Sequence, residues 1–595
     1  MNLPVIISEY TNVDTAVTDL VDAVSSSYSQ NPNMEEIKVW EHLDRDFINS
    51  GINYPIMAEF PMFGLERADF IIVDTQKALV IEAKGWKSIQ KIRGTNMVVI
   101  ADKEHHIDPC YQLQNYVSKM KYFHSSGRNV DYQGILYLYN NNSYTSEECE
   151  IIHGLDDLLD RIKGIGPPGK ELQINEIIEG KFSINEDLID MINRSKLSLM
   201  ANATKTLVSS GYGLTENQAI LVNDILKSVE NGEDKAFIIR GPSGSGKTLV
   251  ALQIVIEAVA RGWKALLAYR NNRLLNTMRQ VLNINNGSVN LSSLVQYYST
   301  GRNIGIGESG FQQDRFGKLD LIVYDEAQRM TESVIQMTQN RSMVKVYFYD
   351  DSQILIGDEA GIEANFTRYL NNCEIRSLTS VFRVPENYLK FVKHLLWDDP
   401  PTSAINYDIN IKKSISDMMA DLNTKKKSNK IALICAFTES RGDSKNSKSE
   451  QNRRIGYPLP SGLDLYKNSG LDIYWLMNEK TEYPRYWRGE LDPLKFCASI
   501  YGAQGFEADF TGVVWGRDLV WRNGWHLNSE AITDNIGNNY SLKSLSKSNP
   551  STAMNLLKNR YYTILTRGIK GTDIFFEDEE TMDHVMKEIE KCKIT

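Results

Sequence analysis

Short apolar runs alternate with segments of helical periodicity through the middle and end of the chain. Between residues 214 and 399 the runs lie at 236–240, 265–269, 319–324 and 344–349, and the alternation resumes at 431–437, 512–515 and 573–576. Strands that alternate with helices in sequence tend to pair in parallel, with the helices crossing over the faces of the sheet. The pattern therefore predicts an α/β fold with parallel sheets in this part of the chain.

Polar and glycine-rich breaks divide the chain into four predicted parts. A mixed region of helices and strands ends in a polar loop near residue 141, and Gly-Pro-Pro-Gly at 166–169 marks a second break. We expect an N-terminal domain over 1–145, a connecting helical region over 146–205, and α/β domains over 206–400 and 401–595. Polar composition also predicts surface insertions at 439–454 and 536–551.

Composition indicates a soluble globular protein. Of the 595 residues 42% are hydrophobic and 24% are charged, which is typical of globular domains. No apolar run reaches the roughly 18 residues that a membrane span needs, and the N-terminus lacks the features of a signal peptide. We therefore expect a cytoplasmic protein without membrane contact. The net charge of −10 disfavours broad adhesion to nucleic acid but is compatible with a local basic surface.

The six cysteines are scattered along the chain without a Cys-x-x-Cys pair. Disulfide frameworks and zinc sites are recognised by regular cysteine spacing, so this pattern predicts neither. We expect buried free thiols, as in a reducing cytosol.

The segment Gly241-Pro-Ser243-Gly244-Ser245-Gly246-Lys247-Thr248 fits the phosphate-loop pattern GxxxxGK[ST] between a predicted strand and a predicted helix. Its glycines let the backbone fold tightly around phosphate oxygens, with amide groups at a helix N-terminus facing the negative charge. Lys247 is expected to reach the β- and γ-phosphates, and the Thr248 hydroxyl to bind Mg²⁺. The sequence thus predicts a site for ATP and Mg²⁺.

A second apolar strand ends in the acids Asp325 and Glu326. At the end of a strand beside a phosphate loop, Asp325 is expected to hold Mg²⁺ and Glu326 to polarise the attacking water. With these two motifs the chain resembles superfamily 1 helicases, whose RecA-like domains have parallel sheets. The resemblance covers about residues 206–595.

Further motifs carry this helicase resemblance. It implies that Gln218 contacts the adenine base, that Gln353 senses the γ-phosphate, that Glu507 lies in a nucleotide-linked motif, and that Arg383 and Arg567 act on the transferring phosphoryl group. Residues 503–509 read Ala-Gln-Gly-Phe-Glu-Ala-Asp, and residues 565–571 read Leu-Thr-Arg-Gly-Ile-Lys-Gly. These two sequences most resemble the helicase group whose ATPase module also occurs in Schlafen-type proteins.

A candidate second site lies near the N-terminus. Two apolar runs flank a predicted tight turn at Thr75 and Gln76. That turn sets a register in which Asp69 lies opposite Glu82, and Lys84 shares the face of Glu82. Opposed like charges destabilise a hairpin, so a divalent cation bridging the two carboxylates is expected. The alternative is an ordinary solvated Glu-Ala-Lys face.

Asp69 and the Glu82-Ala-Lys84 triplet resemble the PD-(D/E)xK nucleases, which have a restriction-endonuclease-like α/β/α fold. The resemblance implies that Asp69 and Glu82 bind Mg²⁺, with Mn²⁺ as a second option, and that Lys84 orients or activates water. Glu36 or Glu41 occupies the place of an additional acid on the first helix. A helix carrying Gln112 and Gln114 follows the core, as in that family.

A nuclease ahead of a helicase core resembles the bacterial nuclease–helicase immunity proteins. That resemblance implies ATP-driven movement on DNA coupled to Mg²⁺-dependent DNA cleavage in defence against phage. Host DNA repair is an alternative, and so is an ATP-gated nucleic-acid sensor with an inactive nuclease domain. The DNA is expected to be single-stranded or duplex, and RNA and a homo-oligomeric assembly stay open.

Overall fold

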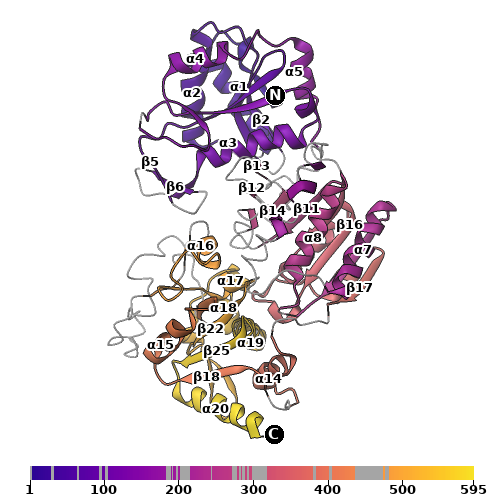
Figure 1. Ribbon diagram of the computed structural model, residues 1–595, viewed down its shortest axis with the longest axis vertical. Coiled ribbons are helices and arrows are strands. Elements are labelled where there is room, and N and C mark those ends of the chain that lie inside the picture. Colours follow the sequence, from indigo (N-terminus) through magenta and orange to yellow (C-terminus); the bar gives the residue numbers. More distant parts are fainter. Residues whose placement is uncertain are drawn as a thin grey trace.

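The computed structural model shows an N-terminal domain followed by a middle and a C-terminal domain, each built around its own sheet (Figure 1). It describes residues 3–28, 32–62, 66–92, 97–100, 105–141, 143–182, 189–190, 192–195, 198–200, 215–242, 244–270, 278–279, 283–284, 289–290, 294–297, 318–378, 384–400, 405–435, 473–475, 477, 482–504 and 506–594.

The N-terminal domain contains a six-stranded mixed sheet in the order β1-β2-β3-β4-β8-β9. Strands β1 to β4 are antiparallel, and β8 and β9 continue the sheet in parallel to β4. The strands are β1 (Val5–Ile6), β2 (Ile56–Pro61), β3 (Arg67–Val73), β4 (Lys77–Ala83), β8 (Asp131–Tyr137) and β9 (Glu150–Ile152). Because β9 is an edge strand of this sheet, the domain extends past residue 145 into the predicted connecting region.

Helices cover both faces of this sheet. On one face pack α1 (Val13–Tyr28), α2 (Met34–Asn49) and α4 (Leu155–Lys163); on the other pack α3 (Pro109–Ser118) and α5 (Glu171–Ile178). Helix α2 begins with a capping box between Asn33 and Glu36, and α3 begins at the cap Asp108 followed by proline, both strong start signals. A small antiparallel sheet, β5 (Ile89–Lys91), β6 (Met97–Ile100) and β7 (His105–Ile107), extends from the domain.

The middle domain has a six-stranded, fully parallel sheet in the order β14-β11-β15-β16-β10-β17. Its strands are β10 (Lys235–Arg240), β11 (Ala265–Tyr269), β14 (Val295–Tyr297), β15 (Leu319–Tyr324), β16 (Ser342–Tyr349) and β17 (Cys373–Ser377). Its helices include α7 (Glu216–Glu230), α8 (Lys247–Ala260), α12 (Glu332–Thr338) and α13 (Glu363–Tyr369). The four strands predicted in this region are confirmed as β10, β11, β15 and β16. A hairpin of β12 (Asn283–Ile284) and β13 (Val289–Asn290) lies against α3 (Figure 1).

The C-terminal domain has a four-stranded parallel sheet in the order β18-β25-β22-β19. The strands are β18 (Asp408–Lys412), β19 (Ile431–Cys435), β22 (Ala508–Trp515) and β25 (Gly568–Phe576). The helices include α14 (Glu386–Trp397), α15 (Ile415–Lys425), α16 (Tyr483–Trp487), α17 (Ile500–Ala503), α18 (Leu542–Ser548), α19 (Pro550–Leu565) and α20 (Glu579–Ile594). Two small sheets pair β20 (Tyr474–Trp475) with β21 (Phe496–Cys497) and β23 (Leu519–Trp521) with β24 (Trp525–Leu527).

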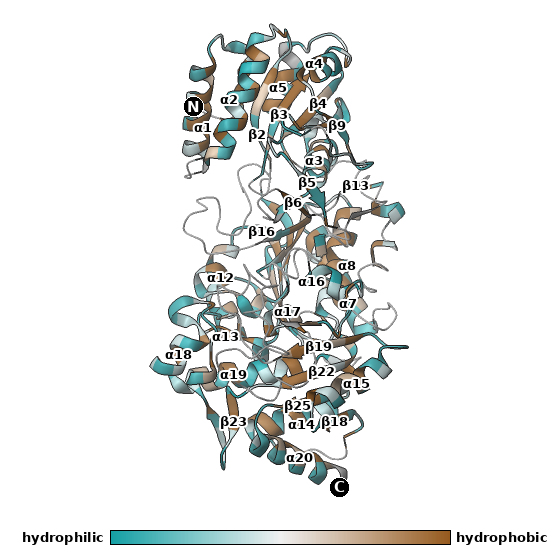
Figure 2. Ribbon diagram, turned by 90° about the vertical axis from the view of Figure 1, so that its left-hand side faces the viewer, coloured by the Kyte–Doolittle hydropathy of each residue, from teal (hydrophilic) through white to brown (hydrophobic). Residues whose placement is uncertain are grey.

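Apolar residues concentrate on the strands, whereas the outer helices α2, α18 and α20 are largely hydrophilic (Figure 2). The segment 536–551 is more than a surface insertion, because α18 packs on α19 and the Gly357 amide of the middle domain donates to Tyr540 O. The other predicted insertion, 439–454, lies outside the described residues. Among the described residues, no helix is long and apolar enough to cross a membrane.

Cys110, at the start of α3, forms a disulfide with Cys149, with Cα atoms 5.5 Å apart. The prediction of free thiols is therefore wrong for this pair, because the fold brings together cysteines 39 positions apart. The prediction of buried free thiols is confirmed for Cys435, Cys497 and Cys592, whereas Cys373 is free but only partly buried.

Candidate active sites

The phosphate loop connects β10 to α8, so the helix begins at Lys247. Gly244 and Gly246 have φ angles of +77° and +79°, in the left-handed region that favours glycine. A Cβ at Gly241 would lie 2.6 Å from Ser245 Oγ and 3.0 Å from Lys247 Cγ. The loop therefore needs its glycines, and it leads directly into a helix N-terminus suited to phosphate.

The polar side chains of the loop meet the end of β15. Lys247 Nζ donates to the carbonyls of Gly241 and Pro242 at 2.6 and 3.1 Å. Thr248 Oγ1 donates to Asp325 Oδ2 at 2.6 Å. The two predicted Mg²⁺ ligands of the ATP site, one hydroxyl and one carboxylate, therefore lie side by side.

The acid pair after β15 is buried. Burial and the neighbouring Glu326 raise the pKa of Asp325 to about 6. Glu326 has a φ of +55°, which is strained for a residue with a side chain and persists where its surroundings fix it. Gln328 provides such a constraint, since its Nε2 donates to Glu326 Oε2 at 2.5 Å and its Oε1 accepts from Asp350 N at 3.2 Å.

Gln353 connects the middle and C-terminal domains. Its Oε1 accepts from Arg567 Nη2 at 2.7 Å, its Nε2 donates to Asp350 Oδ2 at 2.7 Å, and its carbonyl accepts from Gln504 Nε2 at 3.3 Å. Burial lowers the pKa of Arg567, and the carboxylates of Glu326, Glu507 and Asp350 oppose that change. Arg567 therefore lies within electrostatic reach of the acids of the ATP site. A hydrogen bond holds it to Gln353, the residue predicted to sense the γ-phosphate.

The Gln218 side chain is held against the phosphate loop. Its Nε2 donates to Ser245 O at 2.9 Å, and its Oε1 accepts from Thr215 N at 3.1 Å in a capping box of α7. The first of these bonds holds the Gln218 side chain to the backbone of the phosphate loop. The adenine contact of Gln218 stays a prediction.

In the N-terminal domain, β3 and β4 pair in the predicted register. Phe70 lies opposite Ile81 and Val73 opposite Ala78, so Asp69 and Glu82 continue as the next cross-strand pair. The two-residue turn is confirmed, because Asp74 N donates to Lys77 O at 2.9 Å. The Asp74 carboxylate also accepts from the backbone amides of Gln76 and Lys77, which fixes the turn.

The hairpin brings Asp69, Glu82 and Lys84 together. Asp69 Oδ2 accepts from Ala83 N at 2.8 Å, and Lys84 Nζ forms an ion pair with Glu82 Oε1. Burial, with the charge of Asp69, raises the pKa of Glu82 to about 8, and burial also raises the pKa of Asp69. Burial alone would lower the pKa of Lys84, but the two carboxylates raise it above its usual value.

One family model matches the part of the chain that contains the candidate ATP site. Residues 234–578, more than half of the 595-residue chain, match the model of the Schlafen group 3, DNA/RNA helicase domain. The chain belongs to this family. Membership supports a helicase that uses ATP, and the match includes the phosphate loop, the acid pair, Gln353 and Arg567. A search of curated proteins found no match.

Two solved helicases are similar to the chain. One is described as the complex structure of Arterivirus nonstructural protein 10 (helicase) with DNA; it is 11% identical, with a TM-score of 0.28, over 61% of this chain and 65% of that one. The other is described as the structure of PRRSV helicase; it is 11% identical, with a TM-score of 0.26, over 59% of this chain and 54% of that one. This chain therefore spans less than two thirds of the length of either.

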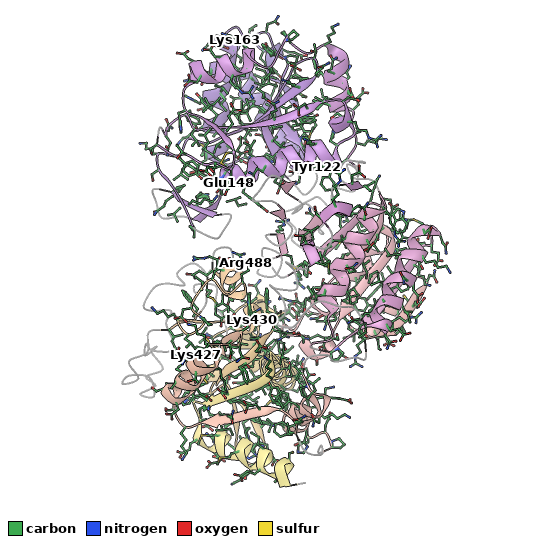
Figure 3. The ribbon with its side chains drawn as sticks, in the orientation of Figure 1. Tyr122, Glu148, Lys163, Lys427, Lys430 and Arg488 are labelled. Atoms are coloured by element: carbon green, nitrogen blue, oxygen red, sulfur yellow. A yellow bond between two sulfur atoms is a disulfide. The ribbon has the colours of Figure 1, made fainter. Side chains whose placement is uncertain are left out.

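Of the remaining residues predicted for the helicase site, the structure describes some and not others. Ser243 and Arg383 lie outside the described residues. Glu507 is buried, and its charge acts on both Arg567 and Lys430. Burial lowers the pKa of Lys430 to about 8, opposed by Glu507; Figure 3 labels this lysine in the C-terminal domain.

Two buried arginines of the domain boundary were missed by sequence reasoning. Arg329 Nε donates to Glu359 Oε1 at 2.8 Å, and its Nη1 donates to Gln504 Oε1 at 3.1 Å in the C-terminal domain. Arg560 Nη2 lies 2.7 Å from Asp534 Oδ2 and donates to the middle domain through Leu355 O at 2.8 Å. For Arg329, the available signal was its position directly after the Asp-Glu-Ala-Gln motif.

A third acid, Glu59 of β2, lies beside Asp69 and Glu82 and was not predicted from the sequence. The pairing of Ala58 with Phe70 and Phe60 with Ala68 places Glu59 level with Asp69. Its carboxylate accepts from Trp40 Nε1 at 2.7 Å and from Arg67 Nε at 2.5 Å. Burial raises the pKa of Glu59 to about 7, opposed by Arg67.

Helices α2 and α3 add the other predicted residues. Glu36 Oε1 accepts from Arg67 Nη2 at 2.9 Å, whereas Glu41 is exposed. Gln112 Nε2 donates to Tyr116 OH at 2.7 Å, and the charges of Glu82 and Asp69 act on that tyrosine. Gln114 instead donates to Glu148 O, on the side of the domain near β5 and β6 (Figure 3).

The donor set of the acid pair fits a hydrated divalent cation. Within the described ranges, no three histidine, cysteine, aspartate or glutamate side chains are arranged to hold a metal ion. Both Glu82 oxygens are buried without a well-formed hydrogen bond, beside the ion pair with Lys84. Mg²⁺ is commonly bound through one or two carboxylates, with water and substrate phosphate completing its shell. Asp69 and Glu82 supply that minimum, and Mn²⁺ takes the same ligands.

Proposed function

We propose that this protein is an ATP-driven helicase or translocase whose N-terminal domain is an Mg²⁺-dependent nuclease, and that the two activities together degrade DNA. The observation that carries the proposal is the convergence of Asp69, Glu82 and Lys84 on paired strands in a chain that also carries a helicase domain. Family membership supports the helicase half.

The architecture of the N-terminal domain supports a restriction-endonuclease-like, PD-(D/E)xK assignment. A helix, three antiparallel strands, a second helix and a parallel strand occur in the order α2, β2, β3, β4, α3 and β8, with the small sheet of β5, β6 and β7 inserted between β4 and α3. The predicted acids lie on the second and third of these strands, and Lys84 follows directly after the third.

In the proposed nuclease reaction, water attacks the scissile phosphorus as the bond to the leaving oxygen breaks. The water proton passes to solvent, and the leaving oxygen takes up a proton from solvent. Asp69 and Glu82 would hold Mg²⁺, which supplies a Lewis acid for the phosphate oxygens. Lys84, which forms an ion pair with Glu82, would stabilise charge on the phosphate and orient or activate the water.

In the proposed ATPase reaction, Lys247 contacts the β- and γ-phosphates, and Thr248 and Asp325 hold Mg²⁺. Glu326 polarises the attacking water. Arg567 stabilises charge that develops on the γ-phosphoryl group, and Gln353 reports that state to the C-terminal domain. Gln218 and Glu507 support the nucleotide site, and Arg383 is proposed as a second arginine on the phosphate.

The biological role that we propose is defence against phage. The combination of a nuclease with a helicase domain supports this role, and host DNA repair would use the same chemistry. Plating phage on cells that express wild-type protein or Asp69→Asn protein separates the two: defence predicts that only the wild-type lowers plaque numbers.

The nuclease proposal is tested by incubating the purified full chain with linear single-stranded DNA and Mg²⁺. We expect cleavage by the wild-type that excess EDTA stops and Mn²⁺ restores. Asp69→Asn should prevent cleavage, while Glu150→Gln, a carboxylate on β9 that pairs with Arg161, should cleave normally. Cleavage that persists in EDTA or in Asp69→Asn protein would refute the metal site.

A further inference from the structure

Two pairs of aromatic rings lie near the backbone of residues 84–86. Trp86 follows Lys84 by two residues, with the ammonium 5.7 Å from the ring centroid, and Trp86 packs at 5.0 Å against His106 of β7. In the second pair, Tyr139 stacks on His42 with centroids 4.1 Å apart and planes 25° apart. The ring pairs thus come from four different segments of the N-terminal domain.

Tyr139 is tied to the acid site through the backbone between Lys84 and Trp86. Strand β8 pairs in parallel with β4, with Ala83 opposite Tyr137, so Tyr139 is level with Gly85. A Cβ at Gly85 would lie 2.4 Å from the Tyr139 hydroxyl oxygen, so the ring lies directly over this backbone. Asn140 Nδ2 donates to Gly85 O at 3.2 Å and holds the two segments together.

These rings are only partly buried. Trp86 and Tyr139 are both half-buried, Tyr139 packs against the core beneath α1 and α2, and 39% of the His42 side chain is exposed. Trp86 belongs to none of the hydrophobic cores of the domain. Burial raises the pKa of Tyr139, Lys84 opposes the change and Asp69 adds to it, which places the ring within electrostatic reach of the acid site.

We propose that the two ring pairs bind bases of an unpaired nucleic-acid strand next to the phosphate that Asp69, Glu82 and Lys84 cleave. The inference rests on the proposed nuclease function and adds its substrate class. Every base has an aromatic face, so rings beside a phosphate site can bind a strand without reading its sequence. In a duplex the neighbouring bases cover those faces. The nuclease therefore acts on single strands, such as those that a helicase exposes.

The activity test uses the full chain with Mg²⁺ and no ATP on circular DNA of one sequence, single-stranded or covalently closed duplex. We expect the single-stranded circle to be cut and the duplex circle to remain. Trp86→Ala and Tyr139→Ala should each raise KM for the single strand by roughly 5- to 140-fold, the range of one base–aromatic stack. Trp86→Phe and Tyr139→Phe should stay near wild-type.

Two controls separate stacking from damage to the fold. Tyr540→Ala, an exposed tyrosine of the C-terminal domain, should leave KM unchanged. On the substrate side, a single strand with abasic positions should be cut as slowly by the wild-type as the normal strand is by the alanine variants. Wild-type KM values in both alanine variants, or equal cleavage of the two circles, would overturn the inference while leaving the nuclease itself established.

A binding readout covers the case in which the wild-type cuts neither circle, which would instead refute the nuclease function. With Ca²⁺ in place of Mg²⁺, a single strand containing 2-aminopurine should lose fluorescence on binding, because the base stacks. That quenching should diminish in Trp86→Ala and Tyr139→Ala but not in Tyr540→Ala. Unchanged quenching in the two variants would contradict the stacking role.

Discussion

Gln353 of the middle domain accepts a 2.7 Å hydrogen bond from Arg567 of the C-terminal domain, and both side chains are buried. Gln353 also binds Asp350, and the Gln328 side chain joins Asp350 to Glu326. A continuous chain of hydrogen bonds therefore runs from the acid pair of the ATP site to the C-terminal domain. Movement between the two domains would change the position of Arg567 relative to the phosphate.

Arg567→Ala should reduce nucleic-acid-stimulated ATP hydrolysis far more than it reduces nucleotide affinity. An arginine that acts on transition-state charge affects turnover, and loss of such a residue typically costs on the order of 10³–10⁵-fold in rate. Gln353→Ala should cause a smaller loss, and the double variant should be no worse than Arg567→Ala because the residues act together. Steady-state kinetics and nucleotide titration measure both effects.

The control is Asn559→Ala, which removes a different interdomain hydrogen bond, to Ile354 O. This variant should hydrolyse ATP near the wild-type rate. A loss equal to that of Arg567→Ala would indicate a general effect of contact between the domains.

Lys247→Ala should abolish ATP hydrolysis, because no other side chain of the described loop brings a cation to the phosphates. Glu326→Gln should retain nucleotide binding and lose turnover, since it removes the carboxylate that polarises water and leaves the loop intact. Fluorescent-nucleotide titration beside a phosphate-release assay distinguishes the two variants. If Glu326→Gln loses binding as well, its role is to hold the loop, through its contact with Gln328.

Glu82→Gln should eliminate DNA cleavage while leaving nucleic-acid-stimulated ATP hydrolysis unchanged, because the acid pair and the ATP site belong to separate domains. The variant should also weaken binding of Mn²⁺ to the N-terminal domain, which electron paramagnetic resonance of added Mn²⁺ measures without cleavage. Undiminished Mn²⁺ binding would show that Glu82 is not a metal ligand.

Asp44 predicts a pH-dependent stability of the N-terminal domain. Burial, with the charge of Glu59, raises the pKa of Asp44 to about 8, so the folded state favours the protonated form. The contribution of Asp44 to the free energy of unfolding is fully present below about pH 4, the usual pKa of aspartate. It is lost as the pH rises through about 8. With a factor of about 1.4 kcal/mol per pKa unit, the loss amounts to a few kcal/mol.

Asp44→Asn should remove this dependence. Hydrogen exchange of the α2 amides, compared between variant and wild-type at each pH, should show the wild-type opening more readily at pH 9 than at pH 5, with little difference in the variant. Parallel pH profiles for the two proteins would show that Asp44 does not titrate in this range.

Local patterns were sufficient to predict the phosphate loop and the Asp69–Glu82 register. The loop motif lies between a strand and a helix, and the hairpin register follows from one two-residue turn that Asp74 fixes. Each depends on contacts within a few residues of sequence, which spacing alone can express. The middle-domain strands were predictable for the same reason, because each is a continuous apolar run.

Contacts between distant segments were not predictable. Glu59 is one acid in an apolar strand, and its partner Trp40 is 19 positions away on a helix. Arg329 and Gln504 are separated by 175 positions, and Cys110 and Cys149 carry no spacing signal. The ring pair of His42 and Tyr139 forms only because α2 and the end of β8 meet in the fold.

If the helicase and nuclease activities are coupled, degradation of a long linear duplex with Mg²⁺ depends on ATP. Fragment lengths over time are compared for wild-type with and without ATP, Lys247→Ala with ATP, and Asp69→Asn with ATP. We predict progressive shortening only for the wild-type with ATP, and strand separation without cleavage for Asp69→Asn. Degradation of the duplex at the same rate without ATP, or by Lys247→Ala, would contradict the account.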